Sequence, residues 1–222
     1  MPSLSKNEED YLKALFHLGS TDSKSEVESK ALAEYLQISA ASVSSMLKKL
    51  KEKSLVEYEP YGKIVLSDRG RTAAIAMIRK HRLWETFLHQ HMHFSWDEVH
   101  EVAEQLEHIR STKLTQELDR FLGYPKTDPH GDPIPDNKGD IPEQVKCVLT
   151  EVPQGTRCKL VSVDDGSVSF LRYLTDIGLA LSSEIQVKEH REFDGSLSIR
   201  YDGRTENVSR QFAEKVFVEV IG

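Results

Sequence analysis

The side chains best suited to bind a metal lie in one stretch near the middle of the chain, from Trp96 to His108. A helix is expected over about 97–109, because apolar residues recur at three- and four-residue steps without an intervening Gly or Pro. At that spacing four polar residues share one stripe of the helix: His100, Glu104, Glu107 and His108. Carboxylate oxygens combined with imidazole nitrogens suit Mn, Fe, Co, Ni or Zn. The alternative is an ordinary solvated helix face.

A second set of such groups lies in the helix expected from Ser67 to about Met92. His81 and Glu85 are four residues apart and therefore share a face of this helix. His89, His91 and His93 follow in alternation, a spacing that cannot converge on one helical face, so we interpret them as surface histidines.

The N-terminal segment has the pattern of a winged helix. A helix over 5–18, opened by a capping box at Ser5 and Glu8, precedes two short helices over 29–36 and 40–53 that are separated by a turn. Two strands are then expected within 55–67, on either side of a turn at Pro60–Gly62. A helix-turn-helix followed by a β-hairpin predicts a DNA-binding domain.

The second helix of this motif begins with small residues that could approach base edges closely: Ser39, Ala41, Ser42, Ser44 and Ser45. Lys48 and Lys49 follow and could meet phosphates, as could Tyr61 and Lys63 on the wing. The alternative is a loosely packed helix start that Ser39 merely caps.

The net charge of -7 argues at first against nucleic acid, but the charge is uneven. Residues 1–75 carry as many basic as acidic groups, so the excess acid lies in the rest of the chain, where it suits cation binding. Neither a run of 18 apolar residues nor a targeting segment is evident, so we expect a cytoplasmic protein without a membrane span. In a reducing compartment, Cys147 and Cys158 are expected to be small core residues.

The fold class expected is mostly α with a β C-terminal domain. Residues 1–74 form the winged helix-turn-helix, and 75–142 form a helical metal-binding and dimerisation domain that ends in a Pro-rich tether over 123–142. Its last helix, over 112–122, carries an apolar stripe that could make a homodimer. Residues 143–222 are expected to form an SH3-like small barrel, with strands over 145–150, 156–163, 184–192, 196–201, 206–209 and 216–220 and a helix over 167–176.

This order of domains resembles the diphtheria toxin repressor family of metal-dependent transcriptional regulators, over nearly the whole chain. The motifs that carry the resemblance are Glu9-Asp10-Tyr11-Leu12, Ser42-Val43-Ser44, Arg79-Lys80-His81-Arg82-Leu83, Trp96-Asp97-Glu98-Val99-His100, Leu106-Glu107-His108 and Asp128-Pro129-His130-Gly131-Asp132-Pro133-Ile134-Pro135. They are specific together, whereas any one alone is weak.

The resemblance implies a divalent metal that bridges the first helix and the central domain. The positions that match its principal site are Asp10, Glu104, Glu107 and His108, with His81 near. Members that favour iron typically have Met and Cys where this chain has Asp10 and Glu104, so the oxygen donors here favour Mn²⁺. Smaller manganese members carry a Glu where this chain has Lys13, which argues against a bridged metal pair. A second site is implied at Glu85, His100, Asp128, His130 and Asp164 or Asp165.

The function implied is Mn²⁺-dependent repression of metal-uptake genes. The metal would order the recognition helices of a homodimer on palindromic double-stranded DNA. Two alternatives stay open: the same regulator with Fe²⁺ as its signal, or an enzyme, a mononuclear metallohydrolase. His-Glu-x-x-His and His-x-x-Glu-His are both absent from the stretch 96–108, and a hydrolase would leave the winged helix unexplained.

Overall fold

A computed structural model of the chain describes residues 4–19, 26–58 and 63–221. The chain folds as two compact units. The first comprises residues 1–81, 106–112 and 135–140, and the second comprises residues 82–105, 113–134 and 141–222. The division into three domains that the sequence suggests stays a prediction.

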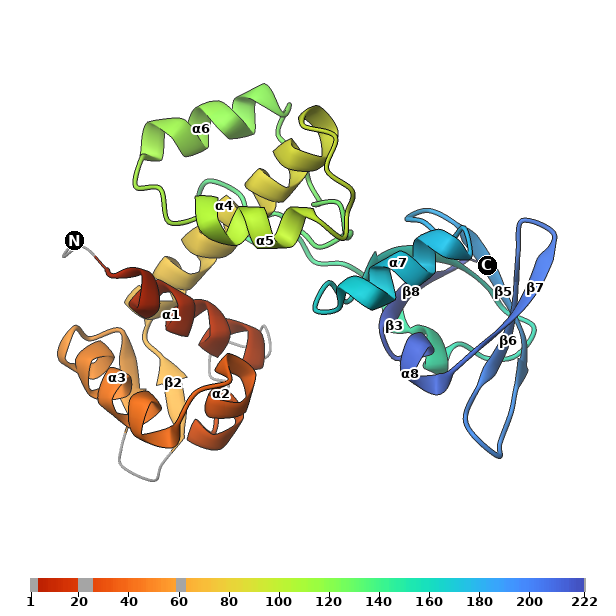
Figure 1. Ribbon diagram of the computed structural model, residues 1–222, viewed down its shortest axis with the longest axis horizontal. Coiled ribbons are helices and arrows are strands. Elements are labelled where there is room, and N and C mark those ends of the chain that lie inside the picture. Colours follow the sequence, from red (N-terminus) through yellow and green to blue (C-terminus); the bar gives the residue numbers. More distant parts are fainter. Residues whose placement is uncertain (1–3, 20–25, 59–62, 222) are drawn as a thin grey trace. The chain divides into compact units, whose positions relative to one another are not determined.

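The first unit contains a helix-turn-helix and a two-stranded ribbon. Its helices are α1 (Lys6–Leu18), α2 (Ser29–Leu36) and α3 (Ala40–Glu52), and β1 (Val56–Tyr58) pairs antiparallel with β2 (Ile64–Leu66) (Figure 1). The capping box is confirmed, since Ser5 accepts from the Glu8 amide and Glu8 accepts from the Ser5 amide. The wing turn at Pro60–Gly62 lies outside the described residues, as does Tyr61.

The core of this unit explains why α1, α2 and α3 pack together. The largest fully buried side chains come from all three helices and the ribbon: Leu12, Leu15, Leu32, Leu47, Leu50 and Ile64. The turn between α2 and α3 depends on Gln37, which adopts a left-handed conformation with φ of 54°. The N-cap of α3 is Ser39, whose hydroxyl accepts from the Ser42 amide. The predicted start of the recognition helix is thereby confirmed.

The long helix α4 (Asp68–His91) carries the chain from the first unit into the second, where α5 (Val99–Leu106) and α6 (Thr112–Phe121) follow. The prediction of one helix over about 97–109 was too long at both ends. Ser95 and Glu98 close a turn before α5, and the amide of Ile109 bonds to the Leu106 carbonyl three residues back. Glu107 and His108 therefore lie in the turn after α5 and not on its face.

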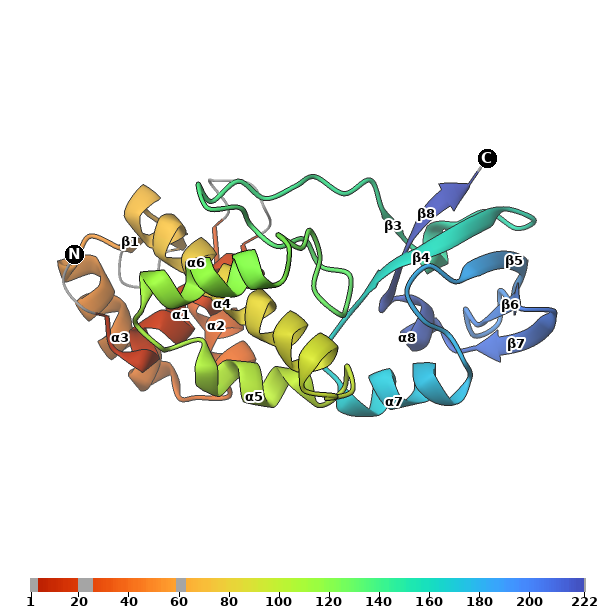
Figure 2. The same ribbon diagram turned by 90° about the horizontal axis from the view of Figure 1, so that it is seen from above.

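The C-terminal part of the second unit is a small barrel of antiparallel strands. Its elements are β3 (Cys147–Val148), a 3-10 turn η1 (Leu149–Glu151), β4 (Arg157–Val163), α7 (Val168–Asp176), β5 (Glu184–His190), β6 (Leu197–Tyr201), β7 (Arg204–Val208), α8 (Arg210–Ala213) and β8 (Val216–Ile221). The strand order is β3-β8-β4-β5-β6-β7, and Figure 2 shows β4, β5 and β8 beside one another. Inward side chains such as Leu160, Val187 and Val218 form one buried core.

Two details of the barrel differ from the sequence analysis. The strand expected over 145–150 is reduced to Cys147–Val148, because Leu149 turns into the core and Pro153 follows, which cannot donate to a strand. Helix α8 was not predicted, although Ser209 caps it. Both cysteines are free, and Cys158 is buried in the core, where burial first and the nearby Cys147 second raise its pKa to about 11.

A short loop of the tether packs tightly on the barrel. The Val163 amide bonds to the His130 carbonyl at 3.0 Å, next to a bulge of β4 between Leu160 and Ser162. Gly131 lies against this bulge with φ of +89°, and a Cβ there would come within 2.0 Å of the Val161 carbonyl oxygen. Only a glycine fits, both sterically and conformationally.

Gly131→Ala is therefore expected to destabilise the protein by about 2–4 kcal/mol, because it combines a backbone clash with left-handed strain. Gly155→Ala is a matched control: its φ is +86°, but nothing lies within 4 Å of a Cβ there, so only about 1 kcal/mol is expected. Urea unfolding of both variants measures the difference. Equal losses would show that the close approach of Gly131 to β4 contributes no stability.

Within the described residues, no helix is both long and apolar enough to cross a membrane.

Candidate metal centre

Three groups suited to bind a metal meet in the first unit. Asp10 of α1 lies beside Glu107 and His108, which follow α5, and one ligand atom from each lies within 4.8 Å of the others. The Nε2 atom of His108 is 3.2 Å from Asp10 Oδ1 and 3.7 Å from Glu107 Oε1. Two carboxylates and one imidazole therefore converge from segments that are far apart in the sequence.

The orientation of His108 is set by a further carboxylate. Glu9, which is buried, lies 2.7 Å from His108 Nδ1 through its Oε2 atom. A carboxylate at Nδ1 favours the tautomer with the proton on that nitrogen, which leaves the lone pair on Nε2. Among the described residues, Nε2 is buried and makes no hydrogen bond. This is the arrangement that a metal-binding imidazole needs.

Glu107 is fully buried and held by two basic side chains. Lys13 Nζ lies 2.9 Å from each of its carboxylate oxygens, and His81 Nδ1 lies 2.5 Å from Oε2. Burial alone would raise the pKa of Glu107, but the His81 contact and the Lys13 charge outweigh it, so the pKa is lowered. Glu107 is therefore kept as an anion.

A second cluster lies within the second unit. Glu85, Asp128 and His130 are all buried, and ligand atoms from the three lie within 4.8 Å of one another. His100 and Asp165 join Glu85 in the same way. The Nδ1 atom of His100 is 3.4 Å from Glu85 Oε1 and 3.6 Å from Asp165 Oδ2. Five of the residues predicted for a second site are thus close together.

The tether loop is shaped to present its two members of this cluster. Asp128 Oδ1 accepts from the amides of His130 and Asp132, which closes a tight turn. His130 Nε2 is 2.7 Å from the Trp96 carbonyl oxygen, and its ring stacks on that indole. Its other nitrogen, Nδ1, is buried without a hydrogen bond among the described residues and lies 3.9 Å from Glu85 Oε2.

Asp128 is a buried carboxyl beside other acids. Burial first, and then the charges of Glu85 and Asp132, raise its pKa well above the ordinary value, although Arg82 opposes this. Arg82 Nε lies 3.4 Å from Asp128 Oδ2, and its guanidinium also bonds to Asp132 and to the Pro133 carbonyl. Without a bound cation this loop carries an electrostatic cost.

Two further predicted ligands, Asp164 and Glu104, have polar partners of their own. Asp164 Oδ2 pairs with Lys215 at 3.1 Å, and its Oδ1 accepts from the Gly166 amide, so each of its carboxylate oxygens has a partner. Glu104 is on α5 in the second unit, where its Oε1 atom is 3.8 Å from His100 Nε2. That Glu104 joins Asp10, Glu107 and His108 stays a prediction.

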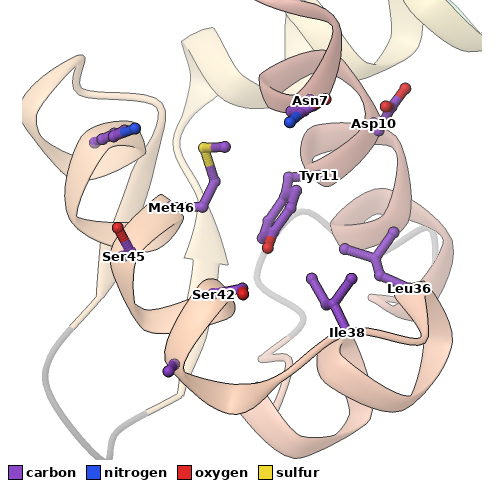
Figure 3. A pocket seen from close by; sticks show the side chains of 10 residues that line it. Asn7, Asp10, Tyr11, Leu36, Ile38, Ser42, Ser45 and Met46 are labelled. Atoms are coloured by element: carbon purple, nitrogen blue, oxygen red, sulfur yellow. The ribbon is translucent and has the colours of Figure 1, made fainter.

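The residues predicted to contact DNA lie on and near α3. Most are exposed: Ser39, Ala41, Ser42, Ser45, Lys48 and Lys49, while Ser44 is half-buried. Ser42, Ser45 and Met46 face Asn7 and Tyr11 of α1 across a groove of about 720 Å³ (Figure 3). Asp10 also lines this groove. Lys63 is exposed but paired with Glu26.

Comparison with known proteins agrees with this architecture. Three family models match: "Iron dependent repressor, N-terminal DNA binding domain" over residues 3–64, "Iron dependent repressor, metal binding and dimerisation domain" over 67–136, and "FeoA domain" over 147–220. The iron-dependent repressor IdeR of Mycobacterium leprae is 31% identical over 170 residues, which cover 71% of this chain and 74% of that protein. The chain belongs to the iron-dependent (diphtheria toxin) repressor family.

Solved structures from this family are also similar over most of the chain. A manganese-dependent transcriptional repressor in complex with manganese has a TM-score of 0.88 and 38% identity, covering 96% of this chain and all of that one. The manganese regulator SloR has a TM-score of 0.79 and 33% identity, covering 98% of this chain and all of that one.

Membership of the repressor family decides several of the open alternatives. The protein is a metal-dependent DNA-binding transcriptional repressor that dimerises and binds a divalent metal, with a winged helix and an SH3-like FeoA domain. It is not an enzyme, so the metallohydrolase alternative is dropped. The exposed apolar groove formed by Trp84, Phe87, Leu114, Leu118 and Phe121 is consistent with a dimer surface.

The residues of both clusters fit a divalent cation, since each pairs carboxylate oxygens with an imidazole nitrogen that is buried without a hydrogen bond among the described residues. The sequence alone indicates no role for Glu9 or Arg82. Glu9 adjoins Asp10 in the motif of α1, but only the fold shows that it contacts His108.

Proposed function

We propose that this repressor responds to Mn²⁺, and that Asp10, Glu107 and His108 hold the ion, with Glu104 and His81 completing or supporting the site. The observation that carries the proposal is the Nε2 atom of His108, which is buried between two carboxylates and makes no hydrogen bond within the described part of the chain. Oxygen donors from Asp10 and Glu107, with a single imidazole, suit Mn²⁺ better than a sulfur-containing set would. The FeoA domain and the tether would add the second site, at Glu85, His100, Asp128, His130 and Asp165.

Asp10 connects the metal centre to the DNA-binding helices. It lies on α1, whose other side chains pack against α2 and α3. Asp10, Glu107 and Glu9 bring three carboxylates together. The Lys13 ammonium at Glu107 offsets part of their mutual repulsion, and the remainder favours a looser attachment of α1 to residues 106–112 when no metal is bound. A divalent ion would supply the positive charge that reverses this repulsion. The metal would have to bind the DNA-binding-competent arrangement of the recognition helices more tightly than the incompetent one by about 3–5 kcal/mol for the competent arrangement to predominate.

The competent dimer would place two copies of α3 in successive major grooves of a palindromic operator. The exposed serines at the start of α3 would lie against base edges, and Lys48, Lys49 and Lys63 would contact phosphates. Lys63 would have to leave Glu26 to do so. Because the operator is chromosomal, we place the protein in the cytoplasm. The regulated genes would encode metal-uptake proteins, so that the amount of these proteins falls when metal is plentiful.

Iron is the second candidate signal, because the relative named above is an iron-dependent repressor. Both ions bind oxygen and nitrogen donors, and the general affinity order even favours Fe²⁺ over Mn²⁺. The difference must therefore come from geometry and from free metal concentration.

The test is operator affinity measured anaerobically at buffered free Mn²⁺, Fe²⁺ and Zn²⁺, using a duplex selected from a random pool. The proposal would be supported if half-maximal operator binding occurred at a free Mn²⁺ concentration below that in the cell, while Fe²⁺ at its cellular free concentration gave no activation. Activation by Fe²⁺ alone within that range would refute the assignment of manganese.

A further inference from the structure

Lys13 contacts the cluster formed by Asp10, Glu107 and His108, although an ammonium cannot be a metal ligand. It is on α1 one helical turn after Asp10, and its side chain is only 12% exposed. Its Nζ atom lies 2.9 Å from both oxygens of Glu107, whose side chain is fully buried. Another lysine–glutamate pair on α1 joins Lys53 to Glu8, and neither residue belongs to the metal-binding set.

The position of this ammonium places it in competition with a metal. Glu107 Oε1 is the oxygen that approaches His108 Nε2, at 3.7 Å, and the same oxygen accepts from Lys13. An ion held by Asp10, Glu107 and His108 would have to share or displace that ammonium. Two like charges at such a short range in a buried site repel each other strongly.

We propose that Lys13 acts as a built-in cation that competes for Glu107 and thereby sets the metal concentration at which this repressor responds. The inference rests on the proposed function, because it assumes that Glu107 is a ligand. Without a metal, Lys13 neutralises part of the carboxylate cluster and so limits the loosening of α1 from residues 106–112. With a metal, it weakens binding, so that the site fills only when the free ion is abundant.

Removal of the charge should therefore tighten metal binding. Lys13→Met and Lys13→Gln are each expected to bind Mn²⁺ at least about tenfold more tightly than the unaltered chain in calorimetric titrations of the full-length protein. Lys13→Arg keeps the charge and should stay within about threefold. Lys53→Met, which breaks the Lys53–Glu8 pair, is the matched control and should leave Mn²⁺ affinity unchanged.

A second readout distinguishes competition from a merely structural contact. The metal-free Lys13→Met protein should unfold at a lower temperature than the unaltered chain, because Glu107 loses its partner, yet Mn²⁺ should raise its unfolding temperature by more. If Lys13 only positions Glu107, the variant should instead bind Mn²⁺ more weakly. Lys13→Gln retains a hydrogen-bond donor and so tests whether the charge itself is responsible.

The outcomes separate the two proposals. Tighter binding by both neutral variants would support the competition. Equal or weaker binding by both, while the unaltered chain binds Mn²⁺ at a site that Asp10→Ala removes, would overturn this inference alone. Absence of any Asp10-dependent Mn²⁺ binding by the unaltered chain would overturn the proposed function, and this inference with it.

Discussion

Glu107→Ala is expected to abolish metal-dependent operator binding. In the unaltered protein, Mn²⁺ should raise operator affinity by about a hundredfold. In the variant, the gain should fall below about threefold, because the buried carboxylate is lost from between Asp10, His108 and His81. Fluorescence anisotropy of a labelled operator duplex, with and without Mn²⁺, measures the gain.

Two controls protect this result from misreading. Glu101→Ala removes an exposed carboxylate from α5. Glu101 belongs to neither metal cluster, so this variant should keep the full metal response. Glu107→Gln keeps a side chain of similar size and should fold like the unaltered protein, yet lack the response. A hundredfold gain retained in Glu107→Ala would show that the switch lies elsewhere.

Asp128→Asn should raise the stability of the metal-free protein but weaken metal binding at the second site. In the metal-free protein it removes a buried charge next to Glu85, and the amide oxygen can still accept from the His130 and Asp132 amides. A gain of about 1–3 kcal/mol in unfolding free energy near pH 7 is expected. The same change should remove the additional stabilisation that a second Mn²⁺ provides, because an amide oxygen is a weaker ligand.

The pH dependence follows from the raised pKa of Asp128. A carboxyl whose pKa is higher in the folded than in the unfolded state binds its proton more tightly when folded. Its contribution to stability is therefore fully present below the unfolded pKa and is lost as the pH rises through the folded pKa. The advantage of Asp128→Asn should thus be small in acid and grow toward neutral pH. Urea unfolding at several pH values, without metal, measures it.

Asp132→Asn offers a comparison in the same loop, since Asp132 is half-buried and pairs with Arg82 and Lys146. Loss of those pairs should lower stability slightly or leave it unchanged. The contrary result would be that Asp128→Asn lowers the unfolding free energy of the metal-free protein, and by the same amount at neutral pH as in acid. It would show that the buried carboxyl is not under electrostatic stress.

Much of the architecture could be predicted because its signals are local. The capping box at Ser5, the short helices around Gln37 and the alternating strands of the barrel each depend on neighbouring residues. The end of α5 could not be predicted in this way, since the 97–109 pattern continues past Leu106. The turn that follows is accompanied by contacts from Glu107 to Lys13 and from His108 to Glu9.

The candidate site could be predicted by residue type but not by contact. Asp10, Glu107 and His108 were proposed through the family resemblance, and the fold brings them together. Their supporting residues were harder to find, because Glu9 and His108 are 99 positions apart in the chain. Of the two alternatives Asp164 and Asp165, Asp165 lies near Glu85 and His100, while Asp164 pairs with Lys215, a contact that no pattern near Asp164 indicates.

Linkage between metal and DNA tests the central claim most directly. If the ion held by Asp10, Glu107 and His108 licenses operator binding, then operator DNA must raise Mn²⁺ affinity by the same factor by which Mn²⁺ raises operator affinity. The measurement is the Mn²⁺ dissociation constant of the full-length dimer, with and without saturating operator duplex. We expect it to fall by about a hundredfold with DNA, and Asp10→Ala to show no such change. An Mn²⁺ affinity that is the same with and without operator would contradict the account.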